Sequence, residues 1–159
     1  AGPRHLREEP MPLSDLLGGA LGAVRAPLSE GARHWRADPG LSDVTVLGDR
    51  RALTRALSTL LARAVRETQQ GDAIAVRAVR SADRIALVVE DEGLGRPAGD
   101  LASPLTTPQA EGTRGLAPGL ATARDLMRAH GGELSLESAA GIGSRAWLTL
   151  PRQRVLRDG

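Results

Sequence analysis

The sequence predicts an α+β fold, a two-layer sandwich in which helices cover one face of a mixed, mostly antiparallel β-sheet. Apolar residues recur at helical spacing in three segments and at alternate positions in several others, and the two kinds of segment are interspersed. Hydrophobic residues make up 41% of the 159 residues, enough for the core of one domain. That core must be aliphatic, because the chain contains two Trp and no Phe or Tyr.

The domain is expected to span residues 12–151, with residues 1–11 as a loose lead-in and residues 152–159 as a short tail. No apolar run approaches the ~20 residues that a membrane-spanning helix needs, and no signal peptide is visible. We therefore expect a soluble, cytoplasmic domain without direct membrane contact, which would also fit a part of a larger protein.

The first third of the domain predicts one helix and two strands. A helix is expected within residues 12–31, where Ser14 is a candidate N-cap ahead of a run of Leu and Val. Residues 34–40 and 43–49 predict short strands around a Pro-Gly turn.

The clearest helix follows at residues 49–68, with Asp49 as its candidate N-cap. Its apolar residues recur at three- and four-residue steps: Leu53, Leu57, Leu60, Leu61 and Ala64. Residues 73–79 and 84–90 then each place three apolar residues on one face, at alternate positions, and predict a hairpin with one buried face. Residues 91–118 show no sustained period, and such long segments are usually functional or mobile.

The last helix, at residues 118–132, has clear end signals. Pro118 suits its first turn, and Gly131 or Gly132 suits a left-handed C-cap. His130 is expected to be a structural residue there, favoured by its partial positive charge near the helix end. Residues 133–138 and 144–151 predict a final strand pair.

Composition excludes several kinds of site. The chain has no Cys, and its three His residues are scattered, so no metal site is expected. Arg and acidic residues are interspersed and aromatic residues are rare, which argues against a nucleic-acid partner.

One motif predicts a ligand site. Asp91 ends the apolar strand 84–90, and its carboxylate suits the amino edge of a base better than a phosphate. Gly93 and Gly95 follow, and a flat ring could lie against their backbone.

The ordered set of motifs around Asp91 resembles the catalytic and ATP-binding domain of sensor histidine kinases, in the GHKL ATPase superfamily. The set comprises the helix about thirty residues before Asp91, a glycine-rich loop that leads into a helix, AHGGEL and GIGSRAWLTLP. The resemblance implies the Bergerat sandwich, which agrees with the fold predicted above. It implies adenine-binding residues Asp91, Gly93, Gly95 and Ser144, and phosphate or lid residues Thr59, Arg63, Gly115 and Gly119.

The chain departs from the family pattern at the phosphate end. The family's first long helix carries two Asn, the second of which helps to hold Mg²⁺, and the aligned residues here are Thr59 and Arg63. A guanidinium only donates hydrogen bonds and repels a cation, so Arg63 argues against Mg²⁺. In the second glycine box, Ala117 replaces a Gly and Pro118 lacks an N–H.

Three functions stay open. A working domain would bind Mg-ATP and pass the γ-phosphoryl to a histidine on a separate dimerisation domain, which then serves a response regulator. A pseudokinase-like domain, or a fragment of a histidine phosphotransferase, would act by docking to proteins. In a third version Arg63 replaces the metal, so that ATP or ADP binds without Mg²⁺. An anti-sigma-factor serine kinase is a weaker alternative, and weak or no kinase activity is favoured.

Overall fold

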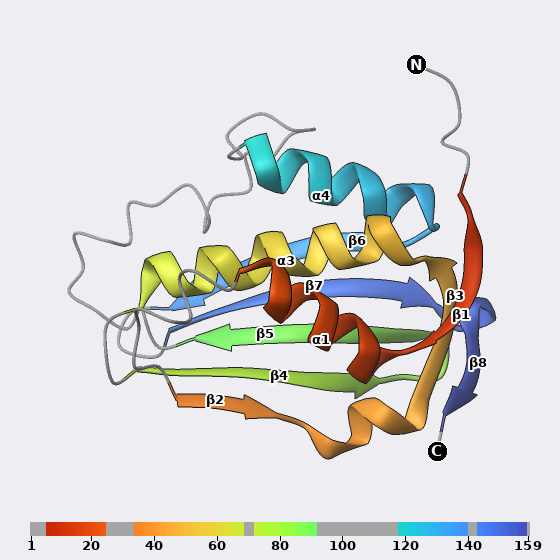
Figure 1. Cartoon of the computed structure of the whole chain (residues 1–159), viewed down its shortest axis with the longest axis horizontal. Helices are drawn as coiled ribbons and strands as arrows, with labels where there is room; N and C mark the ends of the chain where they lie inside the picture. Colours follow the sequence, from red (N-terminus) through yellow and green to blue (C-terminus); the bar gives the residue numbers. More distant parts are fainter. Residues whose placement is uncertain (1–5, 25–33, 69–71, 92–117, 140–142, 159) are drawn as a thin grey trace.

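The computed structural model describes residues 6–24, 34–68, 72–91, 118–139 and 143–158. Within them, five strands form one mixed sheet in the order β2-β4-β5-β7-β6 (Figure 1). Their bounds are β2 (His34–Ala37), β4 (Ala73–Arg80), β5 (Arg84–Asp91), β7 (Gly143–Pro151) and β6 (Glu133–Ala139). Only β2 and β4 pair in parallel, so the predicted mixed, mostly antiparallel sheet is confirmed.

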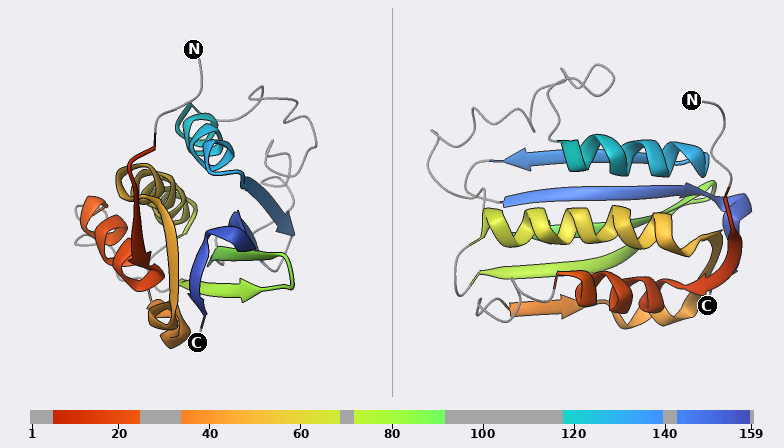
Figure 2. Two further views of the ribbon diagram at one scale, coloured as in Figure 1. Left: turned by 90° about the vertical axis from the view of Figure 1, so that its right-hand side faces the viewer. Right: turned by 45° about the horizontal axis from the view of Figure 1, so that its top comes forward.

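In the described part of the chain, three helices cover one face of this sheet, as predicted. They are α1 (Leu13–Ala23), α3 (Arg50–Glu67) and α4 (Pro118–Ala129). Helix α3 packs against both α1 and α4, and the helices form one layer above the strands (Figure 2). The two layers make up the α/β sandwich that the sequence predicts.

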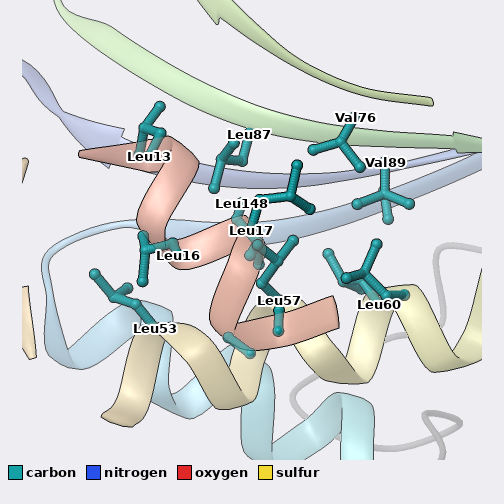
Figure 3. Packing of buried hydrophobic residues seen from close by; sticks show 14 of the residues in the cluster. Leu13, Leu16, Leu17, Leu53, Leu57, Leu60, Val76, Leu87, Val89 and Leu148 are labelled. Atoms are coloured by element: carbon teal, nitrogen blue, oxygen red, sulfur yellow. The ribbon is translucent and has the colours of Figure 1, made fainter. Parts of the chain in front are cut away.

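The core lies between these layers and is aliphatic. On the hairpin, Val76 of β4 and Leu87 and Val89 of β5 point toward the helices. Leucines from α1 and α3 meet them there (Figure 3). The alternation along the strands and the helical spacing along α3 therefore bury the residues predicted for the core.

A second, three-stranded sheet lies at one end of the sandwich. It has the order β1-β3-β8, with β1 (Glu8–Pro12), β3 (Val44–Asp49) and β8 (Val155–Asp158). The expected loose lead-in and short tail therefore each contribute a strand, which corrects that expectation. Strands β2 and β3 lie in different sheets, because a 3-10 helix (Pro39–Asp43) joins them in place of a tight turn.

The helix ends agree with the sequence signals except at α1. Asp49 caps α3, because its side chain accepts a hydrogen bond from the N–H of Ala52 at 3.1 Å. Pro118 begins α4, and Gly131 follows its end with φ of +77°. Ser14 is not the N-cap of α1: the helix starts at Leu13, after Pro12, without a side-chain cap.

His130 joins the end of α4 to the start of α3. Its Nε2 accepts a hydrogen bond from the N–H of Asp49 at 3.0 Å, and its Nδ1 donates to the carbonyl of Leu126 at 2.8 Å. The imidazole is buried, and this burial lowers the pKa of His130. The structural role is confirmed, but the expected positive charge is wrong, because an imidazolium has no lone pair for the Asp49 N–H.

Candidate functional site

Asp91 and Ser144 form a buried polar pair at the end of the large sheet. They are register partners on the neighbouring strands β5 and β7. The hydroxyl of Ser144 donates a hydrogen bond to Oδ2 of Asp91 at 2.7 Å, and each residue is only 5% exposed. Both side chains lie on the face of the sheet that packs against the helices. The apolar surface of this face therefore ends in one carboxylate and one hydroxyl. Such a pair can accept hydrogen bonds from a ligand's amino group.

Ion pairs on the opposite face of the sheet hold these strand ends in register. Glu90, next to Asp91, pairs with Arg77 of β4 at 2.6 Å and with Arg145 of β7 at 3.3 Å. Arg145 in turn lies 3.7 Å from Glu137 of β6. The side chains are partly exposed, so each pair contributes little energy by itself. The row nevertheless connects four strands beside the Asp91–Ser144 pair.

Arg63 is the one cation buried in the described part of the chain, with 4% of its surface exposed. Within the described ranges, its guanidinium forms no hydrogen bond or ion pair. Burial lowers the pKa of Arg63, while the charges of the Asp91 and Glu67 carboxylates oppose that shift. Arg63 therefore lies within electrostatic reach of the carboxylate at the end of β5.

Thr59 lies one turn before Arg63 on α3 and meets the first turn of α4. A Cβ placed on Gly119 would lie 3.5 Å from the methyl group of Thr59, which is ordinary contact. The Thr59 hydroxyl donates to the carbonyl of Arg55 at 2.9 Å, within its own helix. The structure thus places Thr59 beside the first turn of α4, with Arg63 one turn further along α3. Free N–H groups give that end a partial positive charge.

The elements that carry these residues converge at one end of the sandwich, opposite the three-stranded sheet. Strand β5 ends there, β7 begins there and α3 has its last turns there (Figure 1). Of the site residues predicted from the sequence, Asp91, Ser144, Thr59, Arg63 and Gly119 are described. Gly93, Gly95 and Gly115 lie outside the described residues.

Glu67 is a further charged residue near Arg63 that was not predicted from the sequence. The charge of its carboxylate opposes the lowering of the Arg63 pKa that burial causes. The signal was available, because Glu67 follows Arg63 by four residues, and residues at that spacing are neighbours on a helix surface.

Metal and membrane features are missing from the described residues. No three His, Cys, Asp or Glu side chains in those ranges are grouped so that they could hold a metal ion. In the same ranges, every helix is too short or too polar to cross a membrane.

A family comparison identifies this arrangement. The family described as "Histidine kinase-, DNA gyrase B-, and HSP90-like ATPase" matches residues 48–154, which include α3, β5, α4 and β7. The chain belongs to this family. The resemblance seen in the sequence is confirmed, and with it the two-layer sandwich of histidine kinase catalytic domains.

The relatives found by sequence are sensor histidine kinases. The sensor histidine kinase ZraS of Escherichia coli O157:H7 is 32% identical over 161 residues, covering 98% of this chain and 34% of ZraS. The alginate biosynthesis sensor protein KinB of Pseudomonas aeruginosa is 33% identical over 107 residues, covering 65% of this chain and 18% of KinB. The chain therefore spans about a third or less of the length of these relatives.

Solved structures agree with the fold. The mycobacterial sensor histidine kinase MprB is 26% identical, with a TM-score of 0.64, over 91% of this chain and 97% of that one. Full-length ShkA, solved in complex with AMPPNP, is 24% identical with a TM-score of 0.70, over 95% of this chain and 32% of ShkA. The sequence and structure comparisons together show that the domain is similar to parts of sensor histidine kinases.

Proposed function

We propose that the domain binds the adenine of ATP or ADP through Asp91 and Ser144. The observation that carries this proposal is a carboxylate only 5% exposed at the end of β5, held by the Ser144 hydroxyl. A buried carboxylate costs free energy unless hydrogen bonds satisfy it. The exocyclic amino group of adenine can donate a hydrogen bond to such a carboxylate, and glycines follow Asp91 in the sequence.

The proposed setting is cytoplasmic signal transduction. The partners would be a dimerisation and histidine-phosphotransfer domain, in the same or another protein, and a response regulator. In a transfer step, an imidazole nitrogen of that histidine would form a bond to the γ-phosphorus of ATP. The bond from this phosphorus to the bridging oxygen would break, and ADP would leave.

We propose that this transfer is weak or absent in the present chain. Phosphoryl transfer depends on metal ions that neutralise charge on the phosphates. Arg63 occupies the helix position at which the resemblance expects a metal-binding Asn, and a guanidinium is no metal ligand.

Calorimetric titration of the purified domain with ATP, ADP and adenosine tests the adenine site. We expect all three to bind, and we expect Asp91→Asn to weaken each by at least about tenfold, because a charge-assisted hydrogen bond is lost. Asp125→Asn is the matched control, since Asp125 is exposed on α4. Absence of heat and of thermal stabilisation with millimolar ligand would contradict the proposal.

A docking module is the second candidate, and Arg63 is the observation that favours it. A guanidinium near the Asp91 carboxylate can serve as that group's counter-charge without any ligand. The same titrations decide between the two, because a docking module binds neither adenosine nor nucleotides. The docking function would then be tested by measuring whether the domain binds a histidine-phosphotransfer domain.

A further inference from the structure

Mg²⁺ does not fit the phosphate end of this site. The ion requires oxygen ligands in near-octahedral geometry. Arg63 offers only N–H donors and carries like charge, and the neighbouring Thr59 supplies a single hydroxyl oxygen, far fewer ligands than the ion requires. Within the described residues, no cluster of acidic or imidazole side chains compensates for them.

The same end of the site is suited to an anion. A buried cation is costly unless it is paired, and Arg63, 4% exposed, forms no hydrogen bond or ion pair within the described ranges. One turn earlier on α3, the methyl group of Thr59 lies 3.5 Å from where a Cβ on Gly119 would stand, in the first turn of α4. The N-terminal end of this twelve-residue helix adds a second positive group.

We infer that Arg63 takes the place of the divalent cation against the nucleotide phosphates, so that ATP and ADP bind without Mg²⁺. The inference rests on the proposed adenine site at Asp91. A guanidinium pairs with two phosphate oxygens at once, which gives geometry as well as charge. It also supplies the hydrogen-bond partner that Arg63 lacks within the described residues.

Titrations with excess EDTA and with Mg²⁺ test this inference on the wild-type domain. We expect the Kd of ATP and of ADP to agree within about threefold between the two conditions. Arg63→Asn should weaken both nucleotides in EDTA by at least about tenfold and leave adenosine, which has no phosphate, within about twofold. Added Mg²⁺ should then restore part of the ATP affinity of Arg63→Asn.

Arg66→Asn is the matched control. Arg66 lies on the same helix but is exposed, so its loss should change none of the Kd values by more than about threefold. Circular dichroism and thermal denaturation show whether each variant folds. Arg63→Met, which preserves much of the side-chain volume without the charge, repeats the test if Arg63→Asn does not fold.

The outcomes separate the two proposals. ATP binding by the wild type that requires Mg²⁺ would overturn the role of Arg63 but leave the adenine site intact. An unchanged affinity for ATP and ADP in excess EDTA, in a folded Arg63→Asn variant, would also overturn the role of Arg63 and leave the adenine site intact. Failure of adenosine and of both nucleotides to bind would overturn the adenine site itself. Metal-independent binding that is lost with Arg63 alone would support the inference.

Discussion

At the residue scale, the buried polar groups of the described chain fall into two sets. Thr68 and His130 bond to backbone groups: the Thr68 hydroxyl donates to the Ala64 carbonyl, and both nitrogens of His130 are hydrogen-bonded. Arg63, Asp91 and Ser144 gather instead at the end of the sandwich where we place the nucleotide. A protein with an aliphatic core retains such groups at a cost. Their concentration at one end is the residue-level sign of a binding site.

His130 should make stability depend on pH. Burial lowers its pKa below the ordinary value of 6.5. The unfolded chain therefore binds the proton more readily, and the free energy of unfolding should fall as the pH drops from 6.5 through the lower folded pKa. Arg154 reinforces this shift, whereas the hydrogen bond to Leu126 and the charges of Asp49 and Glu8 oppose it. Urea denaturation between about pH 7.5 and pH 5 measures the slope.

The control is His130→Gln, which removes the titrating group. This variant should be less stable at neutral pH but should lack the decline between about pH 6.5 and pH 5. Asp49, whose pKa is lowered from 3.8 mainly by a hydrogen bond from the Arg7 backbone, loses its contribution only at more acidic pH. An equal slope in the wild type and in His130→Gln would assign the pH dependence to other groups.

At the element scale, the sequence predicted the elements that carry their own signals. Helix α3 has a capping Asp49 and a leucine stripe, and α4 has Pro118 at its start and Gly131 after its end. The end strands β1 and β8 were missed because most of their residues are exposed and show no alternation. Their partner is β3, far away in the sequence, so only tertiary pairing forms them.

The candidate site likewise contains residues that a local sequence pattern predicts and features that only tertiary packing creates. Asp91 was predictable, because an acid followed by alternate glycines directly after an apolar strand is a local pattern. The bond from Ser144 depends on the register between β5 and β7, which no local pattern specifies. The burial of Arg63 and the position of Thr59 beside the first turn of α4 depend on tertiary packing.

Gly132 should tolerate no side chain, because it joins α4 to β6 against the neighbouring strand β7. A Cβ at Gly132 would clash with the carbonyl oxygen of Thr149, a backbone atom that cannot rotate away. We expect Gly132→Ala to lower the free energy of unfolding by at least about 2 kcal/mol. Denaturant unfolding measures this change.

Gly18→Ala is the opposite case and serves as the control. Gly18 lies inside α1, is exposed, and has no neighbouring atom within 4 Å of an added Cβ. Alanine should therefore stabilise the domain by about 0.5 to 1 kcal/mol, because it restricts the unfolded chain and favours the helix. Similar effects at Gly18 and Gly132 would contradict the close contact at Thr149.

At the scale of the whole molecule, the three-stranded sheet stabilises the end of the sandwich that lies opposite the candidate site. Arg154 is its central contact. The guanidinium donates to the carbonyl of His130 at 2.6 Å, to Glu8 at 2.6 Å and to the carbonyl of Leu47 at 3.0 Å. One side chain near the C-terminus thus connects β1, β3 and the end of α4. The candidate site and the three-stranded sheet therefore lie at opposite ends of the same helices.

This separation predicts that contacts at the three-stranded sheet contribute to the stability of the domain but do not change its affinity for adenosine. Arg154→Ala should lower the free energy of unfolding by about 2 kcal/mol, because two carbonyl oxygens and a carboxylate lose a charged donor. Arg157→Ala, an exposed change on β8, should cost less than about 0.5 kcal/mol. Adenosine affinity, measured by calorimetry well below the melting temperature, should stay within about twofold in both variants. A loss of affinity in Arg154→Ala that exceeds this range, in a sample shown to be folded, would mean that the two ends are coupled through α3 and α4.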